Sequence, residues 1–148
     1  MSESPRYFED FETGQVIDLG SFPAIDEGDM SAFSAHWDPG VHARPSDGSP
    51  SDLPAASGWY VGAITMKLLV EGLLNQCAAE GSPGLDRLDF LADVHPGDVL
   101  SGRYTVLDAS PSASRPTIGK LRARIEAYNQ RQERVLAIEA MQFMGRRP

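Results

Sequence analysis

Residues 57–75 read SGWYVGAITMKLLVEGLLN and form the most apolar long stretch of the chain. Ser57 is a suitable N-cap for a helix, and the apolar side chains that follow cover more than one helical face. Only Lys67, Glu71 and Asn75 are clearly polar in this stretch. Because a helix that is apolar on most sides is normally buried, the stretch predicts a central helix wrapped by the rest of the chain.

The segments after this helix have the pattern of β-strands. Apolar and charged residues alternate with a period of two over residues 119–127, which predicts a half-buried strand. Further strands are predicted at residues 88–95, 99–107 and 134–144, with a turn signal at Pro96-Gly97-Asp98. Consecutive strands with short connections form an antiparallel meander. The C-terminal part therefore supplies a sheet that can wrap the helix.

The segments before the helix are shorter. Residues 16–22 are expected to form a strand, and a short helix capped by Asp29 is expected to end at Pro39-Gly40. Residues 43–54 and 108–117 are rich in Ser and Pro and are expected to be loops. The result is an α+β fold with one domain over residues 1–148. An open sheet in so small a protein leaves an edge exposed, which predicts a homodimer or a higher homo-oligomer.

Composition narrows the classes of function. The chain has 148 residues, 41% hydrophobic and 23% charged, which is typical of a globular domain and excludes a disordered chain. Its net charge of -8 argues against nucleic-acid binding, since that needs a basic face. No apolar run is long enough for a membrane span, and no signal peptide is predicted. Cys77, the only cysteine, excludes an internal disulfide, and a reducing cytoplasmic location is expected.

Asp38 and His42 are the first candidate pair for chemistry. A carboxylate and an imidazole that lie close together can hold one water molecule, with one group accepting a proton and the other returning one. The alternative is that Asp38 caps a turn before Pro39 while His42 is a solvated loop residue. The residues by themselves leave both interpretations open.

Ser57-Gly58 at the head of the central helix is the second candidate. The first backbone N–H groups of a helix lack intrahelical partners and can stabilise negative charge on a carbonyl oxygen. Gly58 has no side chain, so a ligand can approach its backbone closely. The alternative is that Ser57 is only a helix cap. The sequence contains no metal-binding HExxH motif, no phosphate-binding GxxxxGK[ST] motif and no nucleophile elbow.

Several separated motifs resemble the MaoC-like dehydratase family, whose best-known members are (R)-specific enoyl-CoA hydratases. The resemblance covers nearly the whole chain and is carried by Tyr7-Phe8-Glu9-Asp10-Phe11 with Gly14-Gln15, residues 33–39, Ala56-Ser57-Gly58-Trp59 with residues 63–70, His95-Pro96-Gly97-Asp98 and Ser114-Arg115-Pro116. It implies a hot-dog fold and a role in fatty acid metabolism. It also implies reversible addition of water to a trans-2-enoyl thioester of CoA or an acyl carrier, without a metal or a cofactor other than the CoA part of the substrate.

The resemblance also assigns roles to residues. Asp38 matches the aspartate that polarises the attacking water, His42 the histidine that shares this water, and Gly58 the backbone donor for the thioester carbonyl. Ser57 and Trp59 are expected to contact the substrate, with the acyl chain along the central helix. Basic residues of the sheet and its loops, namely Arg115, Lys120 or Arg122, are expected to meet the CoA phosphates.

One departure from the family pattern keeps other functions open. Three residues separate Asp38 from His42, where the family has four. Catalytic rates are sensitive to shifts of about 1 Å in a reacting group. The alternatives are therefore a catalytically impaired relative that binds acyl thioesters, or a thioesterase on the same fold.

Overall fold

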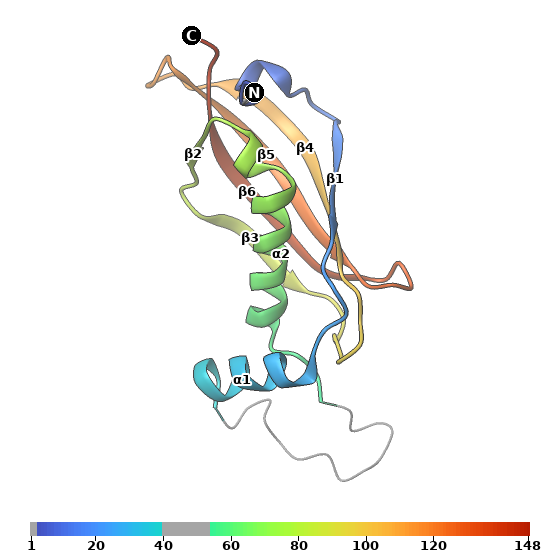
Figure 1. Ribbon diagram of the computed structural model, residues 1–148. Helices are drawn as coiled ribbons and strands as arrows, with labels where there is room; N and C mark the ends of the chain where they lie inside the picture. Colours follow the sequence, from blue (N-terminus) through green and yellow to red (C-terminus); the bar gives the residue numbers. More distant parts are fainter. Residues whose placement is uncertain (1–2, 40–53) are drawn as a thin grey trace.

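The computed structural model describes residues 3–39 and 54–148. Two helices and a sheet dominate the fold (Figure 1). The elements, in chain order, are η1 (Phe8–Asp10), β1 (Val16–Ser21), α1 (Glu27–Trp37), α2 (Gly58–Gly72), η3 (Leu74–Gln76), β2 (Ala79–Gly81), β3 (Leu85–Phe90), β4 (Ser101–Pro111), β5 (Ile118–Tyr128) and β6 (Arg134–Gly145). No helix of these described residues is long and apolar enough to cross a membrane.

The strands of the described chain form one six-stranded sheet. Its order is β1-β4-β5-β6-β2, and β3 also pairs directly with β6, along a different part of that strand from β2. Every pairing is antiparallel, and the long strands β4, β5 and β6 form the predicted meander. The sheet curls around α2, while α1 lies across the N-terminal end of that helix (Figure 1). This arrangement confirms the predicted α+β hot-dog fold.

The core lies between α2 and the concave face of the sheet. Val61, Ile64 and Leu68 of α2 are buried against this face. The buried residues Leu121, Ala123, Ile125 and Ala127 alternate along β5, which confirms the strand predicted from the period of two. Each buried aliphatic side chain stabilises the fold by about 1.5–3 kcal/mol.

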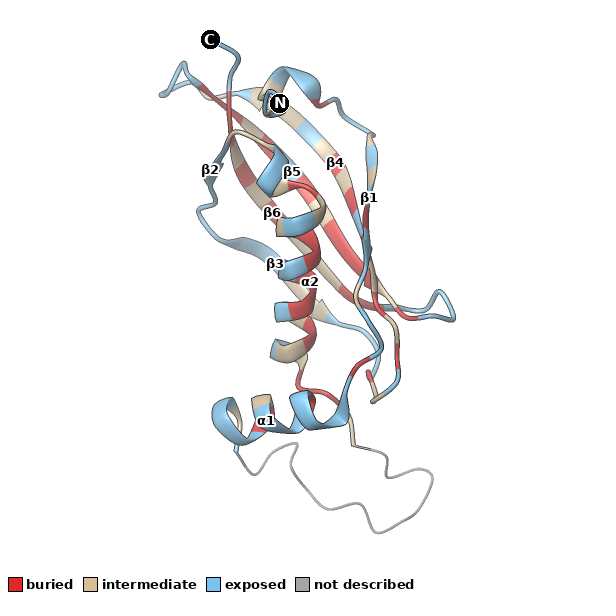
Figure 2. Ribbon diagram, in the orientation of Figure 1, coloured by how far each residue is buried: buried red, intermediate tan, exposed pale blue. Residues whose placement is uncertain are grey.

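The prediction that α2 is covered on most sides is wrong for the single chain. Trp59 is 65% exposed and Met66 is 54% exposed, and Ala63 between them is also exposed. The sheet covers only the opposite face of the helix, as Figure 2 shows. An apolar face of α2 therefore remains open, and this face borders one of the cavities described below.

The two helices differ from prediction at their ends. Asp26, not Asp29, is the N-cap of α1, and its Oδ2 atom accepts a hydrogen bond from the Asp29 N–H at 3.0 Å. The helix therefore begins almost one turn earlier than predicted. Helix α2 ends at Gly72 instead of Asn75, at a close approach to β1: a Cβ atom at Gly72 would lie 2.6 Å from the Leu19 carbonyl oxygen.

Three segments of the sheet differ as well. Strand β2 was not predicted, and β3 ends at Phe90 instead of continuing to residue 95. The predicted loop 108–117 begins later, because residues 108–111 extend β4 and pair with residues 119–122 of β5. Pairing satisfies their backbone groups, and Pro111 lies at the strand end, where a missing N–H is tolerated.

The His95-Pro96-Gly97-Asp98 turn connects the sheet to the segment that leads into α2. Asp98 is buried, and its two carboxylate oxygens accept hydrogen bonds from the His95 N–H at 2.9 Å and from Gln130 Nε2 at 2.8 Å. The Nδ1 atom of His95 lies 3.1 Å from the Pro54 carbonyl oxygen. The turn therefore fixes the position of Pro54, three residues before Ser57.

Candidate active site at the head of the central helix

Ser57 fixes the beginning of α2. Its side chain is buried, and its Oγ atom accepts a hydrogen bond from the Trp59 N–H at 3.3 Å. The Ser57 carbonyl accepts the N–H groups of Tyr60 and Val61 at 3.0 and 3.1 Å. Within the described chain, the Gly58 N–H is then left as a donor without a protein partner. The predicted cap is confirmed, and the backbone donor that the sequence suggested is present.

Phe90 covers Gly58, a contact that the sequence analysis did not predict. A Cβ atom at position 58 would lie 2.6 Å from Cε1 of the Phe90 ring. The ring also contacts Trp59 edge-on, with the ring centroids 5.9 Å apart. Glycine is therefore required at position 58 by packing inside the protein, in addition to any requirement of a ligand.

Asp38 reaches the same region from α1. It is the C-cap of that helix, and its N–H donates to the Ser34 carbonyl at 3.0 Å. The following Pro39 disfavours helical geometry at Asp38, so the chain leaves the helix at this residue. Helix α1 is held against α2 partly by Phe33 and Tyr60, whose ring centroids are 5.2 Å apart. The half-buried Asp38 is thereby positioned near the first turn of α2.

These residues line one cavity of about 420 Å³, here called the head pocket. Its lining comprises Asp38, Ala56, Ser57, Gly58, Trp59, Val61, Phe90, Ala92, Asp93, Val94 and Val135. The structure therefore brings together four of the predicted site residues, at positions 38, 57, 58 and 59. Asp93 adds a second carboxylate that the sequence analysis did not select. The predicted partner of Asp38, His42, lies outside the described residues.

The structure does not bring the predicted CoA-binding residues to the head pocket within one chain. Lys120 lies on β5 in the alternate set to the buried Leu121, so it belongs to the face of the sheet away from α2. Ala127, which is level with the head pocket, lies seven positions further along β5, and this corresponds to about 23 Å along the strand. Arg115 lies in the β4–β5 connection beyond Lys120. Their contact with CoA stays a prediction.

Arg122 is also on the outer face, where it is surrounded by charge. Its Nη2 atom lies 3.6 Å from an Asp86 carboxylate oxygen and 3.9 Å from a Glu139 carboxylate oxygen. Arg124 contacts Glu139 at 3.3 Å. Such exposed ion pairs contribute little to stability. The geometry of Arg122 and Arg124 is that of a solvated charged face.

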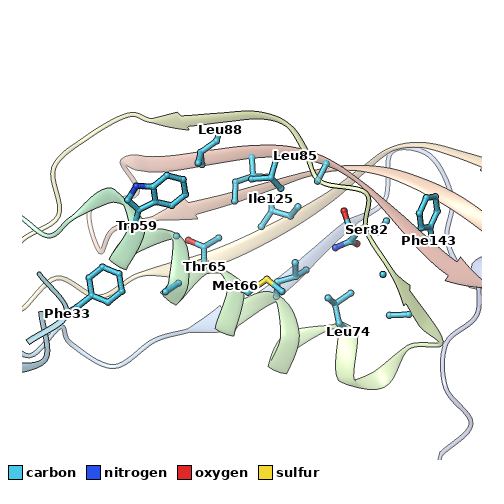
Figure 3. Close-up of a pocket in the computed structure, with 18 residues that line it drawn as sticks. Phe33, Trp59, Thr65, Met66, Leu74, Ser82, Leu85, Leu88, Ile125 and Phe143 are labelled. Atoms are coloured by element: carbon cyan, nitrogen blue, oxygen red, sulfur yellow. The ribbon is translucent and has the colours of Figure 1, made fainter. Parts of the chain in front are cut away.

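A second cavity, here called the side groove, lies along α2 and has a volume of about 560 Å³. Figure 3 shows its lining, which comprises Phe33, Trp59, Gly62, Ala63, Thr65, Met66, Leu69, Leu74, Ala79, Gly81, Ser82, Leu85, Leu88, Ile125, Ile138, Ala140, Gln142 and Phe143. None of these described lining residues is charged, and most are apolar. Trp59 lines both cavities, so the groove and the head pocket lie next to each other.

A metal centre is not evident in the part of the chain that the structure describes. No group of three or more His, Cys, Asp or Glu side chains there is arranged to hold a metal ion. The chemistry available in the head pocket is that of a carboxylate, a buried hydroxyl and a backbone N–H beside an apolar groove. A carboxylate can accept a proton from water, and the backbone N–H can stabilise charge on a carbonyl oxygen.

Comparison with solved structures found close matches over the whole chain. A crystal structure of the MaoC-like dehydratase from Rhodospirillum rubrum is 32% identical with a TM-score of 0.85, covering 97% of this chain and 99% of that chain. A Mycobacterium tuberculosis protein with a double hot-dog fold is 20% identical with a TM-score of 0.77, covering 98% of this chain and 46% of its own. The (R)-hydratase PhaJ1 from Pseudomonas aeruginosa is 21% identical with a TM-score of 0.70, covering 96% and 86%.

No model of a protein family matches the chain, and comparison with curated proteins gave no match. The two structures under 25% identity support the fold alone. The Rhodospirillum rubrum structure goes further, because its identity of 32% extends over 97% of this chain. The family suggested by the sequence motifs is confirmed: the chain belongs to the MaoC-like dehydratase family.

Proposed function

We propose that the protein is a hydratase/dehydratase that adds water reversibly to a trans-2-enoyl thioester of the acyl-CoA or acyl-carrier type. The observation that carries the proposal is the single pocket that contains both the Asp38 carboxylate and the free Gly58 N–H. The similarity to a MaoC-like dehydratase at 32% identity supports it. The apolar side groove that lies next to this pocket supplies space for an acyl chain.

In the proposed reaction, Asp38 accepts a proton from a water molecule as the water oxygen bonds to the β-carbon of the substrate. The electron pair of the carbon–carbon double bond moves toward the thioester, whose carbonyl oxygen gains negative charge. The Gly58 N–H hydrogen bonds to this oxygen and stabilises the enolate-like charge. A proton then returns to the α-carbon, a role that the family resemblance gives to His42. The reverse sequence releases water from a 3-hydroxyacyl thioester.

The acyl chain is proposed to run along α2 in the side groove. Trp59 lies between the two cavities, so its indole would contact the substrate near the reacting carbons. Ser57 caps the helix whose first N–H binds the thioester, and it would act mainly by fixing the position of that donor. The reaction as written uses no metal and no cofactor beyond the CoA part of the substrate. Cytoplasmic location and a role in fatty acid metabolism stay predictions.

Incubation with crotonyl-CoA in the presence of EDTA tests this proposal. The expected result is a loss of the enoyl absorbance without release of free thiol, at a rate that EDTA does not change. Release of thiol would instead indicate a thioesterase, in which Asp38 activates water against the carbonyl carbon. Neither change, with crotonyl-CoA and longer enoyl-CoA substrates, would indicate a relative that binds thioesters without reacting, and would contradict the proposed activity.

We also propose that the protein is at least a homodimer. Large apolar side chains are exposed beside the open sheet edge: Leu85 is 55% exposed, Phe90 is 53% exposed and Leu91 is 44% exposed. They lie close to the uncovered face of α2, so one association could bury both features. Analytical ultracentrifugation is expected to give a mass of at least two chains. A monomer at micromolar concentration would contradict this prediction.

A further inference from the structure

Three polar side chains interrupt the apolar lining of the side groove: Thr65, Ser82 and Gln142. Leu136, Ile138, Ala140 and Met144 occupy alternate positions of β6 and contribute to the core. Gln142 occupies a position in the same set and is only 7% exposed. Burying an amide in an apolar site costs free energy unless its donors and acceptors find partners. The partners of this amide therefore show what the groove is suited to bind.

The oxygen of the Gln142 amide is satisfied within the protein. The hydroxyl of Tyr104 donates a hydrogen bond to Gln142 Oε1 at 2.7 Å. Tyr104 is fully buried, and this burial raises its pKa, so the hydroxyl keeps its proton and remains a donor. The bond fixes the orientation of the amide, because the oxygen must face Tyr104. The Nε2 group must therefore point elsewhere.

The nitrogen of the same amide has no partner among residues 3–39 and 54–148. Other polar groups of the groove are already used. The Thr65 hydroxyl donates to the Val61 carbonyl at 2.8 Å, and the Ser82 hydroxyl donates to the Met141 carbonyl at 2.6 Å. Among the described lining residues, Gln142 Nε2 is thus an unused side-chain donor in a groove whose hydroxyl groups already donate to backbone carbonyls.

Gln142 lies in the part of the groove that is distant from the head pocket. The Ser82 hydroxyl donates a hydrogen bond to the carbonyl of Met141, the residue before Gln142. Figure 3 shows Ser82 well away from Trp59 along the groove. Phe90 lines the head pocket and pairs with Leu136 of β6, so Leu136 is level with that pocket. Gln142 lies six positions after Leu136, which is about 20 Å along β6. An acyl chain must extend well into the groove to reach the amide.

We propose that Gln142 Nε2 binds a neutral oxygen atom, such as that of a hydroxyl, ether or keto group, on the distal part of the acyl chain. The inference rests on the proposed function, because it takes the side groove as the acyl site. A plain alkyl tail would leave the donor unsatisfied. A carboxylate tail is disfavoured as well, because no described lining residue carries a positive charge to pair with it. The preferred substrate class is therefore an oxygenated acyl thioester with an uncharged tail.

Calorimetric titration with saturated acyl-CoA pairs tests the inference. The probes are octanoyl-, dodecanoyl- and hexadecanoyl-CoA, each compared with its ω-hydroxy and ω-carboxy counterpart. For at least one chain length, the ω-hydroxy compound is expected to bind about tenfold more tightly than the plain compound. The ω-carboxy compound of that length is expected to bind more weakly than the ω-hydroxy compound. Equal affinity within every pair, or no binding of any probe, would overturn the inference.

Two variants identify the group responsible. Tyr104→Phe keeps the Gln142 amide but removes the bond that orients it, so a smaller preference for the ω-hydroxy tail than in the wild type is expected to remain. The double variant Y104F/Q142L differs from it only at position 142 and is expected to lose the preference. The double variant removes both partners of the buried hydrogen bond, so no orphaned hydroxyl is left in the core to unfold it. A preference that survives in the double variant would overturn the inference.

Saturated thioesters carry no double bond, so their binding does not depend on hydration. A preference for the ω-hydroxy tail in a protein that does not hydrate enoyl-CoA would contradict the proposed activity and support the assignment of Gln142. Hydration of enoyl-CoA without any tail preference would support the proposed activity and contradict the assignment of Gln142. A negative result in the hydration assay is therefore distinguishable from a negative result in the acyl-CoA titrations.

Discussion

Replacing Asp38 by asparagine is expected to lower kcat for hydration of an enoyl-CoA by about 10²–10⁴-fold, the usual contribution of a positioned general base. Asparagine has nearly the same shape but cannot accept the proton from water. The residue lines the head pocket together with Gly58, so the loss should appear in kcat more than in substrate binding. Steady-state kinetics gives the rate, and thermal unfolding followed by circular dichroism shows that the fold is unchanged.

Two further Asp→Asn variants interpret this result. Asp108 is exposed on β4 and is outside the head pocket, so D108N removes the same charge and is expected to retain the wild-type rate. Asp93 lines the pocket beside Asp38, and D93N is expected to lower kcat much less than D38N. The opposite ranking would assign the base to Asp93. An unchanged rate in D38N would contradict the role proposed for Asp38.

Substitution of alanine for Gly58 is expected to reduce the free energy of unfolding by about 1–3 kcal/mol, the usual cost of overpacking. The new methyl group would lie 2.6 Å from the Phe90 ring, so the ring must move. The same change at Gly62, one turn further along α2, meets no atom within 4 Å. G62A is expected to stabilise the protein by about 0.5–1 kcal/mol, since alanine has the higher helix propensity.

Urea unfolding of the two variants gives opposite signs if the contact is correct. Because Gly58 and Gly62 belong to the same helix, a general effect of helix propensity cannot explain such a difference. In the background of Phe90→Ala, the penalty of G58A is expected to be smaller, which would measure the coupling of the two residues. A G58A variant as stable as the wild type would show that the ring does not pack on this glycine.

The parts of the fold that could be predicted are those with strong local patterns. The apolar stretch 57–75 identified the central helix, and the alternation in residues 119–127 identified β5. Strand β2 has no such pattern, since its three residues are all exposed and it is defined only by pairing with β6. The extension of β4 to Pro111 likewise depends on its partner strand. Long-range pairing supplies information that a local pattern lacks.

The residues of the candidate site that could be predicted are likewise those with a local signal in the sequence. Asp38 was selected because a carboxylate lies close in sequence to His42, and Gly58 because Ser57 marks the start of its helix; both signals are local. Phe90 was missed because its contact with Gly58 requires the pairing of β3 with β6, which is not visible in the sequence. Gln142 did have a signal: it is the polar member of the inward-facing set of β6. A polar residue at an inward position is informative even before a cavity is known.

If the protein has the proposed function, the position of Trp59 in the lining of both the head pocket and the side groove has a consequence for how the substrate range can change. One indole contacts both the region of bond making and the region that measures the tail. A substitution at position 59 would therefore change the turnover rate and the chain-length selectivity together. Substitutions at the end of the side groove distant from Trp59 would change the substrate range more readily, because they would not disturb the reacting carbons.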